Sequence, residues 1–258
     1  MNKKMRLLAV PTLALGAVAL AGSPAMAADA SYSSTLGQLN GTTGTGSIMV
    51  DVTGDQATVN LQVSGLAETF MDGPYPHVQH VHGGAAGTCP TPDADANGDG
   101  IISTSEAAAN YGDILTTLTT SGATTPAEGL NLELGGQGGT YSIQRTITID
   151  DATQDALEAG TAVVVVHGLD PATAGVSEEV FGSPSDLDPE LPLGATSPAL
   201  CGTLVATQMD AMPEGGADTG VATQSSNTAG MIALGGGLVL AAAAGGAFVV
   251  RRNAANNA

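Results

Sequence analysis

The chain has 258 residues, and its 25 acidic side chains against six lysines and arginines give a formal net charge of −19. An acidic surface repels the phosphates of nucleic acids and anionic lipids, so nucleic acid is excluded as an expected partner. Only two cysteines and four histidines are present, so each of these residues can be considered for a specific role.

Residues 1–27 have the organisation of an export signal. Three basic residues lie within the first six positions, residues 7–21 are apolar, and Ala25-Met26-Ala27 has the small residues of a cleavage site. The mature protein is therefore expected to begin near Ala28 and to fold outside the cytoplasm.

Residues 28–206 are expected to form one β domain, which is long enough to bury a core. Two segments that alternate in polarity, 47–53 and 57–63, flank a Gly54-Asp55-Gln56 turn and predict a β-hairpin. Further strands are expected at 77–82, 130–134, 140–149, 161–167 and 200–207, and short helices at 103–110 and 151–158. Short strands separated by glycine turns predict an all-β antiparallel sandwich or barrel.

The four histidines are His77, His80, His82 and His167. His80 and His82 are two residues apart and therefore project from one face of a strand, while His167 ends a run of four valines. Imidazole is a common ligand of copper and zinc, so these three residues predict a metal site. His77 has odd spacing from His80 and would join them only through a bulge in the strand or through the bend at Pro74 and Pro76. A nearby acid such as Asp170 is a candidate for fixing an imidazole tautomer.

Residues 95–106 match the twelve-residue calcium-binding loop, with Gly100 at its sharp turn. The expected ligands are Asp95, Asn97, Asp99, the backbone carbonyl of Ile101, Ser103 and Glu106. Prolines just before the loop exclude the entering helix of an EF-hand, so only the exit helix is expected. The pattern predicts a calcium site that stabilises a β domain, and the alternative is a solvated acidic turn.

Cys89 and Cys201 are most simply a disulfide, because an exported protein folds under oxidising conditions. Such a bond would close a loop of more than a hundred residues and stabilise the fold by roughly 4–5 kcal/mol. The alternative is a pair of buried free thiols.

The end of the chain predicts a membrane anchor. Residues 207–228 are polar and rich in small residues, as in a flexible stalk. Residues 229–250 are apolar, uncharged and long enough to span a bilayer, and the following Arg251-Arg252 favours a cytoplasmic tail at 251–258. The alternative is a buried helix of a soluble domain. An anchored, extracellular domain with possible cell-wall or surface partners is expected, although the Leu-Pro-x-Thr-Gly motif of sortase substrates is absent.

The exported part is more acidic than the whole chain. Arg145 is the single basic residue between the two terminal segments, so the part that holds all 25 acids carries a formal charge of −24. This charge suits divalent cations and disfavours the approach of anions.

The order of the histidine and cysteine segments resembles the copper/zinc superoxide dismutases. The segments are 80–84 (His-Val-His-Gly-Gly), 87–89 (Gly-Thr-Cys), 164–170 (Val-Val-Val-His-Gly-Leu-Asp) and 199–204 (Ala-Leu-Cys-Gly-Thr-Leu). The resemblance implies a Greek-key fold with copper on His80, His82 and His167. The layout is also similar to the CHRD domain, whose Gly-x-x-x-Val-x-x-His strand is matched by 160–167.

The sequence departs from the dismutase pattern in three ways. There is no histidine between Cys89 and His167 to bind zinc, the calcium motif occupies that stretch, and no arginine directly precedes Cys201. The leading hypothesis is therefore a surface protein that binds copper, or zinc, with weak superoxide removal. The alternatives are a non-catalytic CHRD-type adhesion module and a metal buffer without redox turnover, so enzyme status stays open.

Overall fold

The computed structural model of the chain describes residues 28–207. The predicted export signal, stalk, membrane segment and tail lie outside these residues. Within the described part, no helix is both long and apolar enough to cross a membrane.

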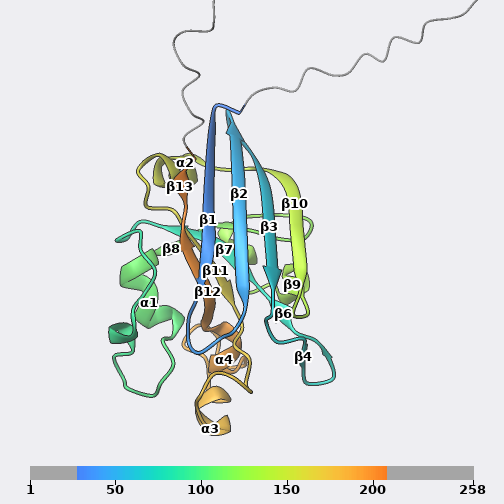
Figure 1. Cartoon of the computed structure of the whole chain (residues 1–258), viewed down its shortest axis with the longest axis vertical. Helices are drawn as coiled ribbons and strands as arrows, with labels where there is room; N and C mark the ends of the chain where they lie inside the picture. Colours follow the sequence, from blue (N-terminus) through green and yellow to red (C-terminus); the bar gives the residue numbers. More distant parts are fainter. Residues whose placement is uncertain (1–27, 208–258) are drawn as a thin grey trace, which may run out of the picture. The chain divides into compact units, whose positions relative to one another are not determined.

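One antiparallel sheet contains nine of the strands, in the order β10-β3-β2-β1-β12-β11-β7-β8, with β13 also paired to β1. Its long strands are β1 (Ala30–Gln38), β2 (Thr45–Thr53), β3 (Gln56–Ser64) and β10 (Tyr141–Thr148). Its shorter strands are β7 (Gln79–Gly83), β8 (Asp113–Thr117), β11 (Val163–His167), β12 (Pro198–Thr203) and β13 (Val205–Ala206). In Figure 1 the long strands stand in front of β7, β8 and β11, because the sheet curls into a half-barrel.

The remaining elements are short. Two small sheets pair β4 (Thr69–Phe70) with β5 (Gly73–Pro74) and β6 (Pro76–His77) with β9 (Gly136–Gln137). The helices are α1 (Thr104–Tyr111), α2 (Asp151–Glu158), α3 (Glu178–Phe181) and α4 (Leu193–Thr196), with 3-10 turns at Pro92–Ala94, Pro126–Glu128 and Leu132–Leu134. The described part is thus mostly β, as predicted.

The core lies inside the curl of the sheet. Alternate residues of the long strands point into it, for example Val50, Leu61 and Ile143, and meet Val164 and Leu200 from the shorter strands. Burying these apolar surfaces is the main force that holds the two halves of the sheet together. The period-2 pattern of the sequence therefore identified the inward face correctly.

Strand β11 is buried on both faces. Val164 belongs to the main core, whereas Val163 and Val165 pack on the opposite side with Tyr111 of α1 and Cys201. This second cluster lies outside the curl of the sheet, beneath α1. The cluster packs on the face of the sheet that also carries the histidines, and Tyr111 contacts His82 there.

The predicted hairpin at 47–63 and the predicted helices at 103–110 and 151–158 are confirmed, to within two or three residues. The predicted strand at 130–134 is wrong, because its last three residues form a 3-10 turn. The bonds Leu134 N–H to Asn131 O and Gly135 N–H to Leu132 O are local, and no strand pairs with the segment. Strands β1 and β8 were not predicted, since the serines of β1 and the short β8 acquire their partners only in the folded sheet.

Candidate metal site

Two neighbouring strands place three histidines on one side of the sheet. In the β7–β11 pair, His80 lies opposite Val165 and His82 lies opposite Val163. Directly opposed residues of antiparallel strands point to the same face, which here is the face covered by α1. His167 ends β11 two residues beyond Val165, so the strand's alternation brings it to the same side.

The three imidazoles converge through one nitrogen each. His80 Nδ1, His82 Nε2 and His167 Nε2 are buried and have no hydrogen-bond partner. One ligand atom from each ring lies within 4.8 Å of those of the other two, and no other group of three or more His, Cys, Asp or Glu side chains in residues 28–207 gathers in this way. Buried polar atoms are normally satisfied, so three buried ring nitrogens that lie close together without partners form a group that could bind a metal ion.

The second nitrogen of each ring is bonded to a backbone carbonyl. His80 Nε2 donates to Gly129 O at 2.9 Å, His82 Nδ1 to Gly112 O at 2.9 Å, and His167 Nδ1 to Thr196 O at 2.7 Å. A carbonyl can only accept, so each bond assigns the proton to that nitrogen and leaves the converging nitrogen as a lone pair.

The carbonyl partners could not be found from the sequence, because the carbonyl group is common to every residue. Asp170, the predicted candidate, instead accepts a bond from Ala172 N–H and is not a hydrogen-bond partner of any triad ring. The orientation of the three rings is therefore determined by carbonyls at the ends of α1, of α4 and of the 3-10 turn Pro126–Glu128, not by an acidic side chain.

Burial keeps the three rings neutral. It lowers the pKa of His82 to about 4 and, together with the neighbouring His82, that of His167 to about 3. The pKa of His80 lies well below its usual value, mainly because the ring is buried and secondly because His167 and His82 are close to it. All three histidines therefore present unprotonated nitrogens at neutral pH, which is the state a metal requires.

The structure does not bring His77 into this group. Its Nδ1 lies 2.9 Å from His167 O and its Nε2 lies 3.0 Å from Ala67 O, so neither nitrogen is free. The ring lies against that of Tyr75, with centroids 4.6 Å apart and planes inclined by 31°. Strand β6 pairs His77 with Gly136, whereas β7 begins only at Gln79, and this break turns the side chain away.

A cavity of about 320 Å³ lies beside the triad, and all three histidines line it. Its other walls are mostly apolar and come from Val78, Thr104, Ile114, Pro126, Ala127, Gly129, Leu130, Leu187 and Thr196. A metal held by the three histidines would therefore lie beside this cavity.

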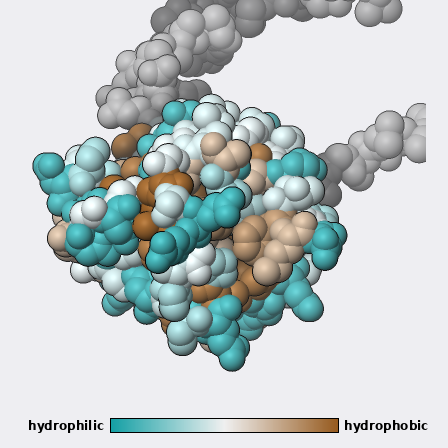
Figure 2. All heavy atoms as spheres, turned by 90° about the horizontal axis from the view of Figure 1, so that it is seen from below, coloured by the Kyte–Doolittle hydropathy of each residue, from teal (hydrophilic) through white to brown (hydrophobic). Residues whose placement is uncertain are grey.

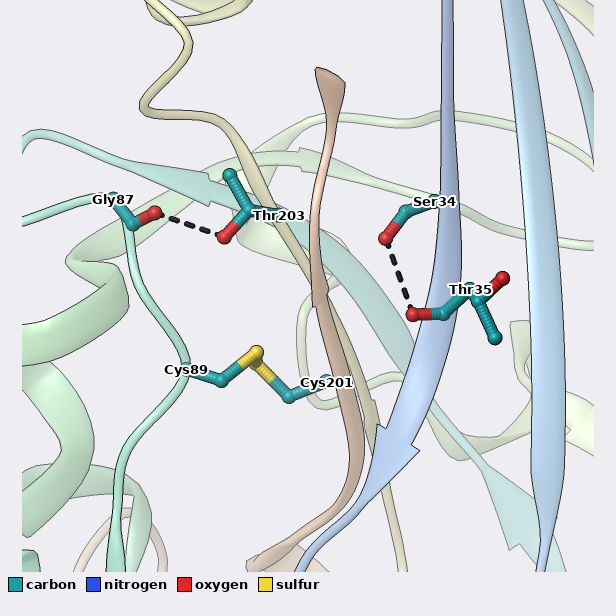
Figure 3. Close-up of a disulfide and its surroundings, with 6 residues drawn as sticks. All are labelled: Ser34, Thr35, Gly87, Cys89, Cys201 and Thr203. Atoms are coloured by element: carbon teal, nitrogen blue, oxygen red, sulfur yellow. Dashed lines mark hydrogen bonds between the residues drawn. A yellow bond between two sulfur atoms is a disulfide. The ribbon is translucent and has the colours of Figure 1, made fainter.

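The predicted disulfide is present. Cys89, in the loop after β7, is bonded to Cys201 of β12, across 112 residues of sequence (Figure 3). Close to it, the Thr203 hydroxyl donates to Gly87 O at 2.9 Å. Cys201 lies opposite Val165, which lies opposite His80, so the bond ties the loop to the same rows of the sheet that carry the triad.

Five of the six predicted calcium ligands lie on the loop that leads into α1, and the sixth, Glu106, lies in the first turn of that helix. Asp95 accepts bonds from Gly98 N–H at 2.8 Å and Gly100 N–H at 3.0 Å, and both glycines have positive φ. Glu106 returns to the start of the loop and accepts from Asn97 N–H at 3.2 Å. The acids are on the loop's inner side, although they are not gathered as closely as the triad nitrogens.

The same loop is stabilised by a capping box. Ser103 Oγ accepts from Glu106 N–H, and Glu106 Oε2 accepts from Ser103 N–H at 2.9 Å. Glu106 therefore caps α1 in addition to any role as a ligand.

Comparison with known proteins adds no relative: neither any protein-family model nor any curated protein matches the sequence. The geometry of the histidine triad is therefore the basis of the functional interpretation.

Proposed function

We propose that the domain is a copper-binding protein of the cell surface, with the metal held by His80, His82 and His167. The observation that carries the proposal is the convergence of three buried, unpartnered ring nitrogens, each oriented by a carbonyl bond on the opposite side of its ring.

The donor set favours copper over the other common divalent ions. Three neutral imidazoles without a carboxylate suit copper and zinc, and at equal availability the Irving–Williams order places copper first. Calcium and magnesium are disfavoured at this site because they prefer oxygen ligands. Bound copper would supply one-electron redox chemistry, whereas the protein supplies the rigid triad and the surrounding cavity.

Several features support the likeness to the copper/zinc superoxide dismutases and to the CHRD domain. The strands of the curled sheet are antiparallel, as in those all-β folds, and β1 lies between β2 and β12 from the far end of the domain. The Cys89–Cys201 bond links the loop after the His-x-His strand to β12, near the end of the domain, as that resemblance implies. No zinc-binding histidines accompany the triad in the described residues, so weak superoxide removal by copper alone is the form of activity proposed.

Calcium binding by residues 95–106 is a separate proposal. The turn at Gly98 and Gly100 and the inward carboxylates of Asp95 and Glu106 support it. A filled loop would stiffen the start of α1, whose Tyr111 contacts His82. Export, membrane anchoring through residues 229–250 and surface partners are likewise proposed from the sequence.

The alternative function is a CHRD-type adhesion module without catalysis, in which calcium and the disulfide provide rigidity. Metal analysis of the purified full-length chain distinguishes the two, combined with copper electron paramagnetic resonance and a superoxide assay. We expect one copper per chain with nitrogen hyperfine structure, which a His80→Ala/His167→Ala variant loses.

The matched control is His77→Ala, which also removes a buried histidine but leaves the triad intact. It is expected to be less stable and still to bind one copper. Failure of the wild-type chain to take up copper or zinc would refute the metal site and favour the adhesion module. Copper uptake without superoxide removal would support a metal buffer.

A further inference from the structure

We propose, on the basis of the metal site above, that the open position of the bound metal selects small neutral ligands, such as a diatomic gas, and disfavours anions. Three protein nitrogens leave copper with at least one vacant position. In residues 28–207 no fourth His, Cys, Asp or Glu joins the group. All three histidines line the cavity, so a metal that they hold would border it.

Apart from the metal itself, the cavity offers an anion no positive charge. No lysine, arginine or acidic side chain lines it, and its only ionisable residues are the three histidines that would hold the metal. An anion that entered would lose its hydration and meet mainly carbon atoms, such as those of Val78 and Ile114. A neutral diatomic molecule loses far less on leaving water.

The two hydroxyls in the wall already have partners. Thr104 Oγ1 donates to Thr196 O at 2.8 Å. Thr196 Oγ1 is hydrogen-bonded to Ser185 Oγ at 2.6 Å and also donates to Leu193 O at 3.3 Å. Neither hydroxyl is a ready donor for a bound anion, because it would have to give up an existing bond.

The mouth of the cavity is apolar as well. Leu130 and Leu187 line it and are also 38% and 42% exposed, so they form its solvent-facing rim. Figure 2, which views the molecule from the end where α3 and α4 lie, shows apolar patches set among hydrophilic ones. An apolar rim admits neutral molecules without providing a charged guide.

The electrostatic potential of the protein surface also disfavours the approach of anions. The described residues contain one basic side chain of lysine or arginine type, Arg145, and it is held by the carbonyls of Thr119 and Gly122 at 2.8 Å. Acidic side chains far outnumber it, so the surface potential repels anions. The volume of about 320 Å³ is ample for a diatomic ligand, since a water molecule occupies about 30 Å³ of liquid.

The test uses the full-length chain loaded with copper. Carbon monoxide is added to the reduced protein and its bond stretch is followed by infrared spectroscopy. Azide is titrated into the oxidised protein and followed by electron paramagnetic resonance, at low and high concentrations of a weakly coordinating salt. We expect stoichiometric carbon monoxide binding, and weak azide binding that strengthens with salt because screening reduces the repulsion.

A matched pair of variants tests the role of charge at the rim. Leu187→Lys places a cation at the mouth, whereas Met49→Lys places one at a similarly exposed position on β2, outside the cavity. Leu187→Lys should tighten azide binding on the order of threefold, because one added positive charge would act on the azide through water. Met49→Lys should leave azide binding unchanged. Copper content is measured first for both.

The outcomes separate the two proposals. A chain that takes up no copper overturns both the metal site and the ligand selectivity. A chain that binds copper but not carbon monoxide overturns only the selectivity. Azide binding that is tight and insensitive to salt in the wild type would also overturn it, as would equal responses of the two lysine variants.

Discussion

The ring of Tyr111 lies against the ring of His82, with centroids 4.5 Å apart and planes inclined by 56°. Tyr111 is fully buried and belongs to the cluster beneath α1. The contact links the helix that follows the proposed calcium loop to a proposed copper ligand. The position of α1 therefore affects the geometry of the triad directly.

Replacing Tyr111 by alanine should destabilise the protein by about 3–5 kcal/mol, the usual cost of removing a buried aromatic ring. It should also weaken copper binding, because His82 loses the surface that holds its ring. Tyr111→Phe is the control: its hydroxyl makes only a long 3.4 Å bond to Thr104 O, so copper affinity should be kept. Urea unfolding and copper titration measure the two effects, and equal copper affinity in all three proteins would contradict the role given to the ring.

Gly112→Ala should displace the carbonyl that orients His82. Gly112 has φ 84°, and a Cβ there would lie 1.9 Å from Gly83 O, so the backbone must shift. Loss of such an orienting bond typically lowers metal affinity 10–100-fold. Gly54→Ala is the matched control, since φ is also positive at 58° but a Cβ meets nothing within 4 Å.

The Gly54 variant should lose about 1–2 kcal/mol of stability from the left-handed backbone and keep its copper affinity. Competition with a copper chelator distinguishes the two variants. If Gly54→Ala weakened copper as much as Gly112→Ala did, the effect would be general destabilisation and not loss of the bond to His82.

The rule that alternate strand residues share a face was sufficient to place His80 and His82 together. His167 was added by elimination, and its position beside them depends on the pairing of β7 with β11. The sequence was also sufficient for the hairpin around Gly54, where alternation and turn residues agree.

Other features depended on contacts between distant segments. His77 could not be placed, because its direction is set by the pairing of β6 with β9 and by carbonyls of Ala67 and His167. Residues 130–134 have the leucine alternation of a strand but lack a partner strand. The carbonyls of Gly112 and Gly129 that orient the triad could not be predicted, because every residue has a backbone carbonyl.

The stability of the metal-free protein should fall as the pH is lowered from about 6.5 towards 4. The pKa of His82 is lowered to about 4 and that of His167 to about 3 in the fold, whereas an unfolded histidine titrates near 6.5. In this window the unfolded state binds more protons, so the free energy of unfolding rises with pH, by up to about 1.4 kcal/mol per pH unit for each histidine.

Urea unfolding at a series of pH values measures this slope. The control is His82→Gln, which should have a shallower slope because one of the depressed groups is gone. A metal-free wild type whose stability is flat between pH 6.5 and 4 would contradict the burial of neutral histidines.

Calcium should raise the melting temperature, and EGTA should reverse the rise, if residues 95–106 bind the ion. Asp95→Asn removes the charge of the first ligand and should abolish most of the shift. Asp93→Asn removes an equal charge from a neighbouring exposed position that is not in the ligand pattern, and should keep it. A response that persists in Asp95→Asn would contradict the assignment. Glu106 is a poorer test, because its carboxylate also caps α1.

Loss of the disulfide should destabilise the protein by about 4–5 kcal/mol. The bond between Cys89 and Cys201 spans 112 residues, and in the chain-entropy model a loop of that size restricts the unfolded chain by this amount. A Cys89→Ser/Cys201→Ser variant, compared in urea with the oxidised and the reduced wild type, measures the difference. Because Cys201 lies in register with Val165 and His80, the variant should also bind copper more weakly. Equal stability of the oxidised protein and the double variant would show that the bond adds nothing beyond the packing of β12.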